Sequence, residues 1–282
     1  MKVSGSSDGG ELRPLSAEEL PQTLSYLVAD PLRNLILIGF LKSAGTSDDN
    51  TVFAFWKDGA QKGVGLLGSA AAWAGGSEVA QALGEKARES GTSQLNTVVV
   101  GLTHEVEVFL HASQDSRPGK PETLFLYVLR RGELNVPSPG PVTVRPARRA
   151  ECEELFRIHT GLYLELAGRH LPEPEASKQR LMRRLGAGKI WIACERDKIV
   201  FKADLASETS EVALIEAVWT TPDLRGHGIG SKALTDLCAL LLATYPMLCL
   251  FLGKDRSDLA GFYERIGFMY HGDYGDYTVV RY

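Results

Sequence analysis

Three alternating glycines stand directly before a helical pattern in the segment LRGHGIGSKAL, residues 224–234. Gly226, Gly228 and Gly230 give the backbone conformations and close approaches that other residues exclude. Apolar residues then recur at three- and four-residue spacing over 234–245, which predicts an amphipathic helix. The first N–H groups of a helix lack intrahelical partners and lie at the positive end of its dipole. We therefore expect this loop to bind an anion.

The elements around the loop indicate a mixed α and β domain. An apolar stripe over 155–166 predicts a helix, residues 189–206 predict a β-hairpin, and the apolar run VALIEAVWT at 212–220 predicts a central strand. After the loop and its helix, MLCLFLG at 247–253 predicts a buried strand, and 259–266 a short helix closed by a glycine. The loop thus lies between a central strand and a long helix.

A second domain precedes this one. The segment RRGELNVPSPGPVTVRP contains a cluster of proline and glycine near the middle of the chain, which is typical of a linker. The openings LRPLSAEEL and VRPARRAECEEL, on either side of it, share a β-like start, Arg-Pro and an acidic helical segment, which hints at duplication. We predict a disordered leader at 1–10, an N-terminal domain at 11–134, a linker at 135–143 and a C-terminal domain at 144–282.

Two familiar phosphate loops do not match. A Walker loop needs Gly-x-x-x-x-Gly-Lys-Ser/Thr, which GHGIGSK lacks. A dinucleotide fingerprint needs Gly-x-Gly-x-x-Gly directly after the strand, whereas TPDLR intervenes here. The chain that follows Asp255, the candidate ribose-binding acid, is also too short for the rest of a Rossmann sheet.

A third loop does match. Arg225 to Gly230 resembles the Arg/Gln-x-x-Gly-x-Gly/Ala pyrophosphate loop of the GNAT acyltransferases, with Pro222 three residues ahead. Downstream, GFYERIGF resembles the family's Tyr-x-x-x-Gly-Phe signature as Tyr263 to Phe268. The chain departs from the family pattern at Arg256 and Leu259, where Asn and Ala are common. The full layout looks like a bacterial two-domain type in which a degenerate GNAT-like domain precedes the catalytic one.

The resemblance implies an α/β (α+β) fold with two GNAT-like domains, each a mixed, mostly antiparallel sheet flanked by helices. It implies an N-acetyltransferase that uses acetyl-CoA or another acyl-CoA as co-substrate. The pantetheine would pair with the strand at Val218, Trp219 and Thr220. The pyrophosphate would lie on the loop, whose residues are Arg225, Gly226, His227, Gly228, Ile229, Gly230 and Ser231.

Three further residues are candidates for the chemistry. Glu216 interrupts the apolar strand beside the expected thioester, so it could serve as a general base, or it could simply pair with a neighbouring cation. Tyr263 could protonate the leaving thiolate, or pack as a core aromatic. Glu165 lies at the edge of the apolar stripe of its helix, where the acceptor binds in the family. It could therefore contact the acceptor, or it could be a glutamate on a solvated helix face.

Composition restricts the partners. The net charge of −4 and the absence of a Lys or Arg run argue against nucleic acid and an anionic membrane. The four cysteines lack metal-ligand spacing, so we expect reduced thiols, no metal and a cytoplasmic protein. The acceptor could be a small-molecule amine or a peptide or protein amine, and a monomer and a homodimer both stay open. The competing function is a non-catalytic CoA-binding sensor or scaffold, with a nucleotide-dependent oxidoreductase third.

Overall fold

The computed structural model describes residues 10–44, 51–68, 70–91, 98–115, 117, 119–135, 143–167, 170–171, 174–272 and 277–281. The predicted leader and the predicted linker lie almost wholly outside these residues. None of the helices in the described ranges has the length and apolar content needed to cross a membrane.

The chain forms two compact units, and neither is continuous in sequence. Unit 1 comprises residues 1–126, 251–257 and 270–282, and unit 2 comprises residues 127–250 and 258–269. The pattern of the sequence did not indicate this interleaving. The predicted domain ranges stay a prediction.

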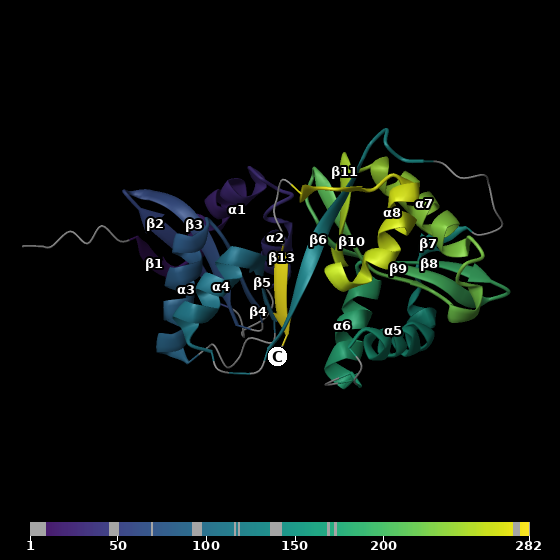
Figure 1. Ribbon diagram of the computed structural model, residues 1–282, viewed down its shortest axis with the longest axis horizontal. Helices are drawn as coiled ribbons and strands as arrows, with labels where there is room; N and C mark the ends of the chain where they lie inside the picture. The colour runs from purple at the N-terminus through teal and green to yellow at the C-terminus, as the bar shows by residue number, and fades with distance from the viewer. Residues whose placement is uncertain are drawn as a thin grey trace, which may run out of the picture. The chain divides into compact units, whose positions relative to one another are not determined.

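In unit 1, helices flank a mixed sheet (Figure 1). Its elements are β1 (Glu11–Pro14), α1 (Leu20–Val28), α2 (Leu35–Ala44), β2 (Thr51–Lys57), β3 (Ala60–Leu67), β4 (Ala70–Ala74), α3 (Ser77–Ser90), β5 (Val98–Leu102), α4 (Thr103–Ser113), the first part of β6 (Lys120–Arg130) and β13 (Tyr277–Arg281). The β2–β3 hairpin turns at Asp58 and Gly59, which both have positive φ as a tight turn requires. The turn lies within KDGAQKG, residues 57–63, between two apolar runs.

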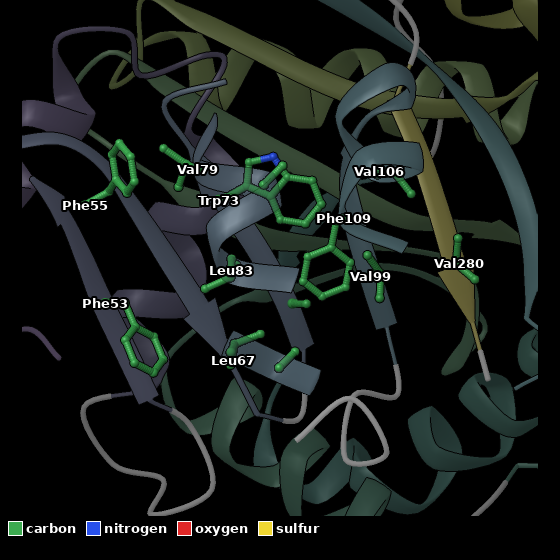
Figure 2. Packing of buried hydrophobic residues seen from close by; sticks show 13 residues of the cluster. Phe53, Phe55, Leu67, Trp73, Val79, Leu83, Val99, Val106, Phe109 and Val280 are labelled. Carbon is green, nitrogen blue, oxygen red and sulfur yellow. The ribbon is translucent and has the colours of Figure 1, made fainter. Parts of the chain in front are cut away.

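The last strand of the chain completes unit 1. β13 pairs antiparallel with β5 on one side and with β6 on the other. Figure 2 shows Val280 of β13 in the same cluster as Trp73, Val99 and Phe109. Trp73 and Phe109 stack with their ring centroids 5.1 Å apart. This core therefore needs a residue from the far end of the sequence.

Unit 2 carries the glycine loop. Its elements are β7 (Val144–Pro146), α5 (Cys152–Ala167), α6 (Pro174–Gly186), β8 (Ile190–Glu195), β9 (Lys198–Glu208), β10 (Val212–Thr220), α7 (Ile229–Leu242), the first part of β11 (Met247–Gly253) and α8 (Ala260–Ile266). Strands β7, β8, β9 and β10 pair antiparallel in that order, and β11 joins β10 in parallel. Helices α5 and α6 pack on one face through Leu155, Leu181 and Leu185. The predicted fold class is confirmed, although α6 was not predicted.

The similar openings of the two halves have the same local structure. In each, a short strand leads through a single 3-10 turn into a helix, and an arginine of the strand binds a glutamate six residues later. Arg13 Nη1 lies 2.9 Å from Glu19 Oε2, and Arg145 Nη1 lies 3.1 Å from Glu151 Oε2. The hydrogen bonds from these arginines lower the pKa of Glu19 to about 2 and lower the pKa of Glu151. The echo in the sequence is thus a repeated structural unit.

Candidate active site

Two structural requirements explain the three glycines of the loop. Gly226 and Gly228 have φ of +80° and +81°, in the left-handed region that side chains disfavour. Gly230 lies in the first turn of α7, where a Cβ atom would be 2.5 Å from Thr220 Oγ1 at the end of β10. Arg225 to Gly228 are exposed. The loop thus presents the N-terminus of a 14-residue helix, close against the strand before it.

Strand β10 is buried in its first half and more exposed in its second half. Its first four residues are buried, but Glu216 is exposed and the residues that follow are half-buried. The ladder with β11 covers Val212–Leu214, while the ladder with β9 continues to Thr220 after an irregularity between Glu216 and Trp219. Ala217, inside that irregularity, has φ of +50°. The second half of β10 is therefore a bulged strand whose described ladder is with β9 alone.

The structure brings together two predicted site residues, Arg225 and Glu165. Arg225 Nη1 and Nη2 each lie 2.9 Å from a carboxylate oxygen of Glu165, on α5, and Arg225 Nε donates to the Thr220 carbonyl at 3.1 Å. The hydrogen bonds to Glu165 raise the pKa of Arg225. His227 is exposed, and its Nδ1 lies 3.0 Å from the Arg225 carbonyl. The cation of the loop is thus tied both to its own strand and to α5.

Glu216 also has a cationic partner. Its Oε1 accepts a hydrogen bond of 2.8 Å from Nη1 of Arg184, on α6. Burial alone would lower the pKa of Arg184, but the carboxylates of Glu216 and Asp204 outweigh burial, and the pKa is raised. The structure therefore shows the paired state that the sequence left open for Glu216.

Tyr263 lies in α8 and is 8% exposed. Its ring makes edge contacts with Phe262 and Phe268, at centroid distances of 5.0 and 6.1 Å. Gly267, with φ of +116°, ends the helix as predicted and turns the chain toward Phe268. The Tyr-x-x-x-Gly-Phe signature is thus one packed unit in which Gly267 allows Phe268 to return to the tyrosine.

Sequence reasoning missed several charged residues on the face covered by α5 and α6. Lys202 and Asp204, both on β9, are 0% and 4% exposed and lie 2.5 Å apart. His159 of α5 has its pKa lowered, first by burial and then by the charge of Lys202. The signal was present, because two charges two residues apart in the apolar run VFKADLA point to one face of a strand. Among the described residues, no group of three or more His, Cys, Asp or Glu could hold a metal ion.

Comparisons with known proteins agree on the fold. Residues 186–270 match the family model described as "Acetyltransferase (GNAT) domain". No curated protein matches the chain. Among solved structures, a GCN5-related N-acetyltransferase from Sphaerobacter thermophilus has a TM-score of 0.64 at 14% identity, with 98% of this chain and 96% of that chain covered.

Two further structures are similar over nearly their full length. A tandem GNAT protein from the clavulanic acid biosynthesis pathway has a TM-score of 0.63 at 14% identity, with 96% and 97% of the two chains covered. A GNAT-family acetyltransferase from Colwellia psychrerythraea has a TM-score of 0.56 at 12% identity, with 96% and 98% covered. At such low sequence identity, the structural similarity establishes the fold alone. The chain therefore has the fold of two-domain GNAT proteins, and its residues 186–270 match the GNAT acetyltransferase domain model.

Proposed function

We propose that the protein is an acyl-CoA-dependent N-acyltransferase that transfers acetyl from acetyl-CoA directly to a primary amine in the cytoplasm. The carrying observation is the junction of β10 and α7, where a bulged strand leads into an exposed loop with two left-handed glycines and a helix N-terminus. Such a loop suits the pyrophosphate of CoA, because consecutive free N–H groups and the helix dipole both favour an anion. The adjacent edge of β10, at Val218 to Thr220, suits the amide groups of pantetheine.

The chemistry needs a neutral amine. An amine with a pKa near 10.4 is neutral in roughly one molecule in a thousand at pH 7.4, which costs about 4 kcal/mol. Glu216 would take the proton as the nitrogen attacks the thioester carbonyl. The C–S bond then breaks, and the thiolate takes a proton from Tyr263. The products are an amide and free CoA. The proton on Glu216 returns through the solvent to the Tyr263 phenolate, so the one proton released overall is the one that the ammonium loses when it becomes neutral.

The ion pairs favour a second candidate function, that of a non-catalytic CoA-binding sensor or scaffold. Arg225 is held by Glu165, and Glu216 by Arg184. A base that stays paired with a guanidinium is a poor proton acceptor, because the cation stabilises the carboxylate. In that case the loop would bind CoA without turnover.

One experiment in two steps separates these functions. Thermal melts with CoA, acetyl-CoA, NAD and ATP test the loop, and a ligand at 100 times its dissociation constant adds about 2.7 kcal/mol of stability. We expect stabilisation by CoA and acetyl-CoA alone. Thiol release from acetyl-CoA is then measured with a panel of amines. CoA binding without thiol release would favour the sensor, and an unchanged melt at millimolar CoA would contradict both.

A further inference from the structure

Four charged side chains form a continuous chain across α6, β9 and β10 in unit 2. Glu216 bonds to Arg184 at 2.8 Å, Arg184 lies 3.6 Å from Asp204, and Asp204 lies 2.5 Å from Lys202. Asp204 and Glu216 are also direct cross-strand partners. These four side chains connect the position just before the bulge of β10 to the interior of unit 2.

The exposed fraction of these side chains falls steadily from Glu216, through Arg184 and Asp204, to Lys202. It is 44% for Glu216, 33% for Arg184, 4% for Asp204 and 0% for Lys202. A ligand can therefore reach Glu216 and the outer edge of Arg184, while the inner pair is fixed. Within the described part of the protein, Arg184 Nη2 and Lys202 Nζ are buried without a hydrogen bond of good geometry. Charge attraction, more than hydrogen bonding, holds the inner members.

The charges of these side chains balance, two cations against two carboxylates. A simple ammonium that displaced Arg184 from Glu216 would leave three cations against two carboxylates, and Arg184 would share Asp204 with Lys202. Unbalanced charge in a partly buried site is costly. A ligand with both an ammonium and a carboxylate avoids this, because its ammonium takes Glu216 and its carboxylate takes Arg184. One ion pair is then replaced by two, and the balance is kept.

We propose that the acceptor is a zwitterionic amine, a molecule of the amino-acid class whose carboxylate lies a few bonds from the nitrogen. This inference rests on the proposed function for the place of the amine, and it adds the class of substrate. Glu216 binds the ammonium and orients the nitrogen. Arg184 binds the carboxylate, with the planar two-donor geometry that suits it. Asp204 is a positioning residue that holds Arg184 from the interior of the unit, and Lys202 in turn holds Asp204.

The test compares amino acids with their carboxamides, pairs of nearly equal shape that differ in the negative charge. Each pair is measured by thiol release from acetyl-CoA and by thermal melts with CoA present, so that binding is read without turnover. We expect the wild type to prefer the acids by about 10- to 100-fold, the range of a charge-assisted contact. A carboxamide also lowers the pKa of its neighbouring amine and makes it more reactive, so chemistry alone would give the opposite preference.

Variants of α6 sharpen the result. Arg184→Met should abolish the preference for acids and leave the stabilisation by CoA unchanged. Arg184→Lys should retain part of the preference, and Arg183→Met, at an exposed arginine next in sequence, should change nothing. Equal use and equal binding of acids and carboxamides by the wild type would overturn the inference, even if Arg184→Met failed to fold. Thiol release from neither, together with selective stabilisation by acids, would count against the acyl transfer alone.

Discussion

The arginine of the glycine loop has most of its donors engaged before any ligand arrives. Glu165 takes one N–H from each terminal nitrogen and the Thr220 carbonyl takes a third, so two of the five donors remain. Both side chains of the Arg225–Glu165 pair are more than 40% exposed, and such pairs contribute at most about 1 kcal/mol. The pair therefore competes only weakly with a pyrophosphate.

We expect Arg225→Ala and Glu165→Gln to have opposite effects on CoA binding. Loss of Arg225 should weaken CoA about 10- to 150-fold, because a charge-assisted contact is removed. Loss of the Glu165 charge should strengthen CoA by up to about fivefold, because the arginine is no longer neutralised. Calorimetric titration with CoA measures both. If Glu165→Gln weakened binding as much as Arg225→Ala, the pair would be a strut that holds the loop.

The phenol of Tyr263 can be separated from its ring. Tyr263→Phe keeps the edge contacts with Phe262 and Phe268 and removes one hydroxyl. If the hydroxyl protonates the thiolate, kcat should fall by about 100-fold or more with CoA affinity nearly unchanged. Steady-state kinetics on a verified amine, with a melt as the control, decides this. Normal turnover with a lower melting temperature would make the tyrosine structural.

The half-buried His159 gives a dependence of stability on pH with a definite sign. Burial and the charge of Lys202 lower its pKa below the usual 6.5. As pH falls below about 6.5, the unfolded chain takes up a proton that the folded chain resists, so this contribution to stability is lost toward acid pH. Because solvent screens part of the effect, we expect less than about 1 kcal/mol.

The variant His159→Gln isolates this contribution. Urea unfolding at pH 7.5 and at pH 5.5 gives the free energy of unfolding that each protein loses between the two pH values. The carboxylates contribute equally to this loss in the wild type and in the variant. We expect a smaller loss in His159→Gln than in the wild type. Equal losses would mean that His159 titrates normally in the folded protein.

At the scale of elements, the junction of β10 and α7 depends on how closely a helix approaches a strand. A Cβ at Gly230 would be 2.5 Å from Thr220 Oγ1, well inside contact distance, so Gly230→Ala must displace Thr220 or α7. We expect a lower melting temperature and CoA binding weakened by about tenfold or more, because the helix N–H groups move. Melts and CoA titrations measure the two effects.

A second substitution tests the cause. Thr220→Ala removes the hydroxyl that the new Cβ would meet, while Cβ and Cγ2 of Thr220 would lie 3.6 and 3.8 Å from it. The double variant should therefore recover most of the loss. Gly228→Ala is the contrasting case, because its Cβ meets nothing within 4 Å but its φ of +81° is unfavourable for alanine. No recovery in the double variant would show that the glycine acts through the backbone.

The sequence predicted the elements whose pattern is local. The hairpin at 189–206, the helix over 155–166 and the cap at Gly267 follow from turn chemistry and apolar periodicity. The exposure of the second half of β10 was not predicted, because the bulge at Ala217 and the short ladder with β11 depend on the neighbouring strands. The loop residues were identified from their motif, but the partners of Arg225 and Glu216 come from helices 60 and 32 residues away. The spacing of residues along the sequence does not predict such long-range contacts.

At the scale of the whole molecule, the ends of the chain are combined in one core. Strand β13 lies between β5 and β6 in unit 1, although residues 127–250 form most of unit 2. Val280 is 3% exposed and belongs to the cluster of Trp73, Val99 and Phe109. Unit 1 therefore cannot complete its sheet until the last residues of the chain are available. A substitution near the C-terminus should act on the N-terminal core.

We expect Val280→Ala to destabilise unit 1 by about 2 kcal/mol, since two buried methyl groups are lost. Val28→Ala, at a valine of α1 that is 47% exposed, is the matched control and should change stability by less than about 0.5 kcal/mol. Hydrogen exchange locates the effect: amides of β5 should lose protection in Val280→Ala, while amides of β9, in unit 2, should keep theirs. Equal loss in both strands would mean that the units unfold as one. Loss in β9 alone would contradict the assignment of the last strand to unit 1.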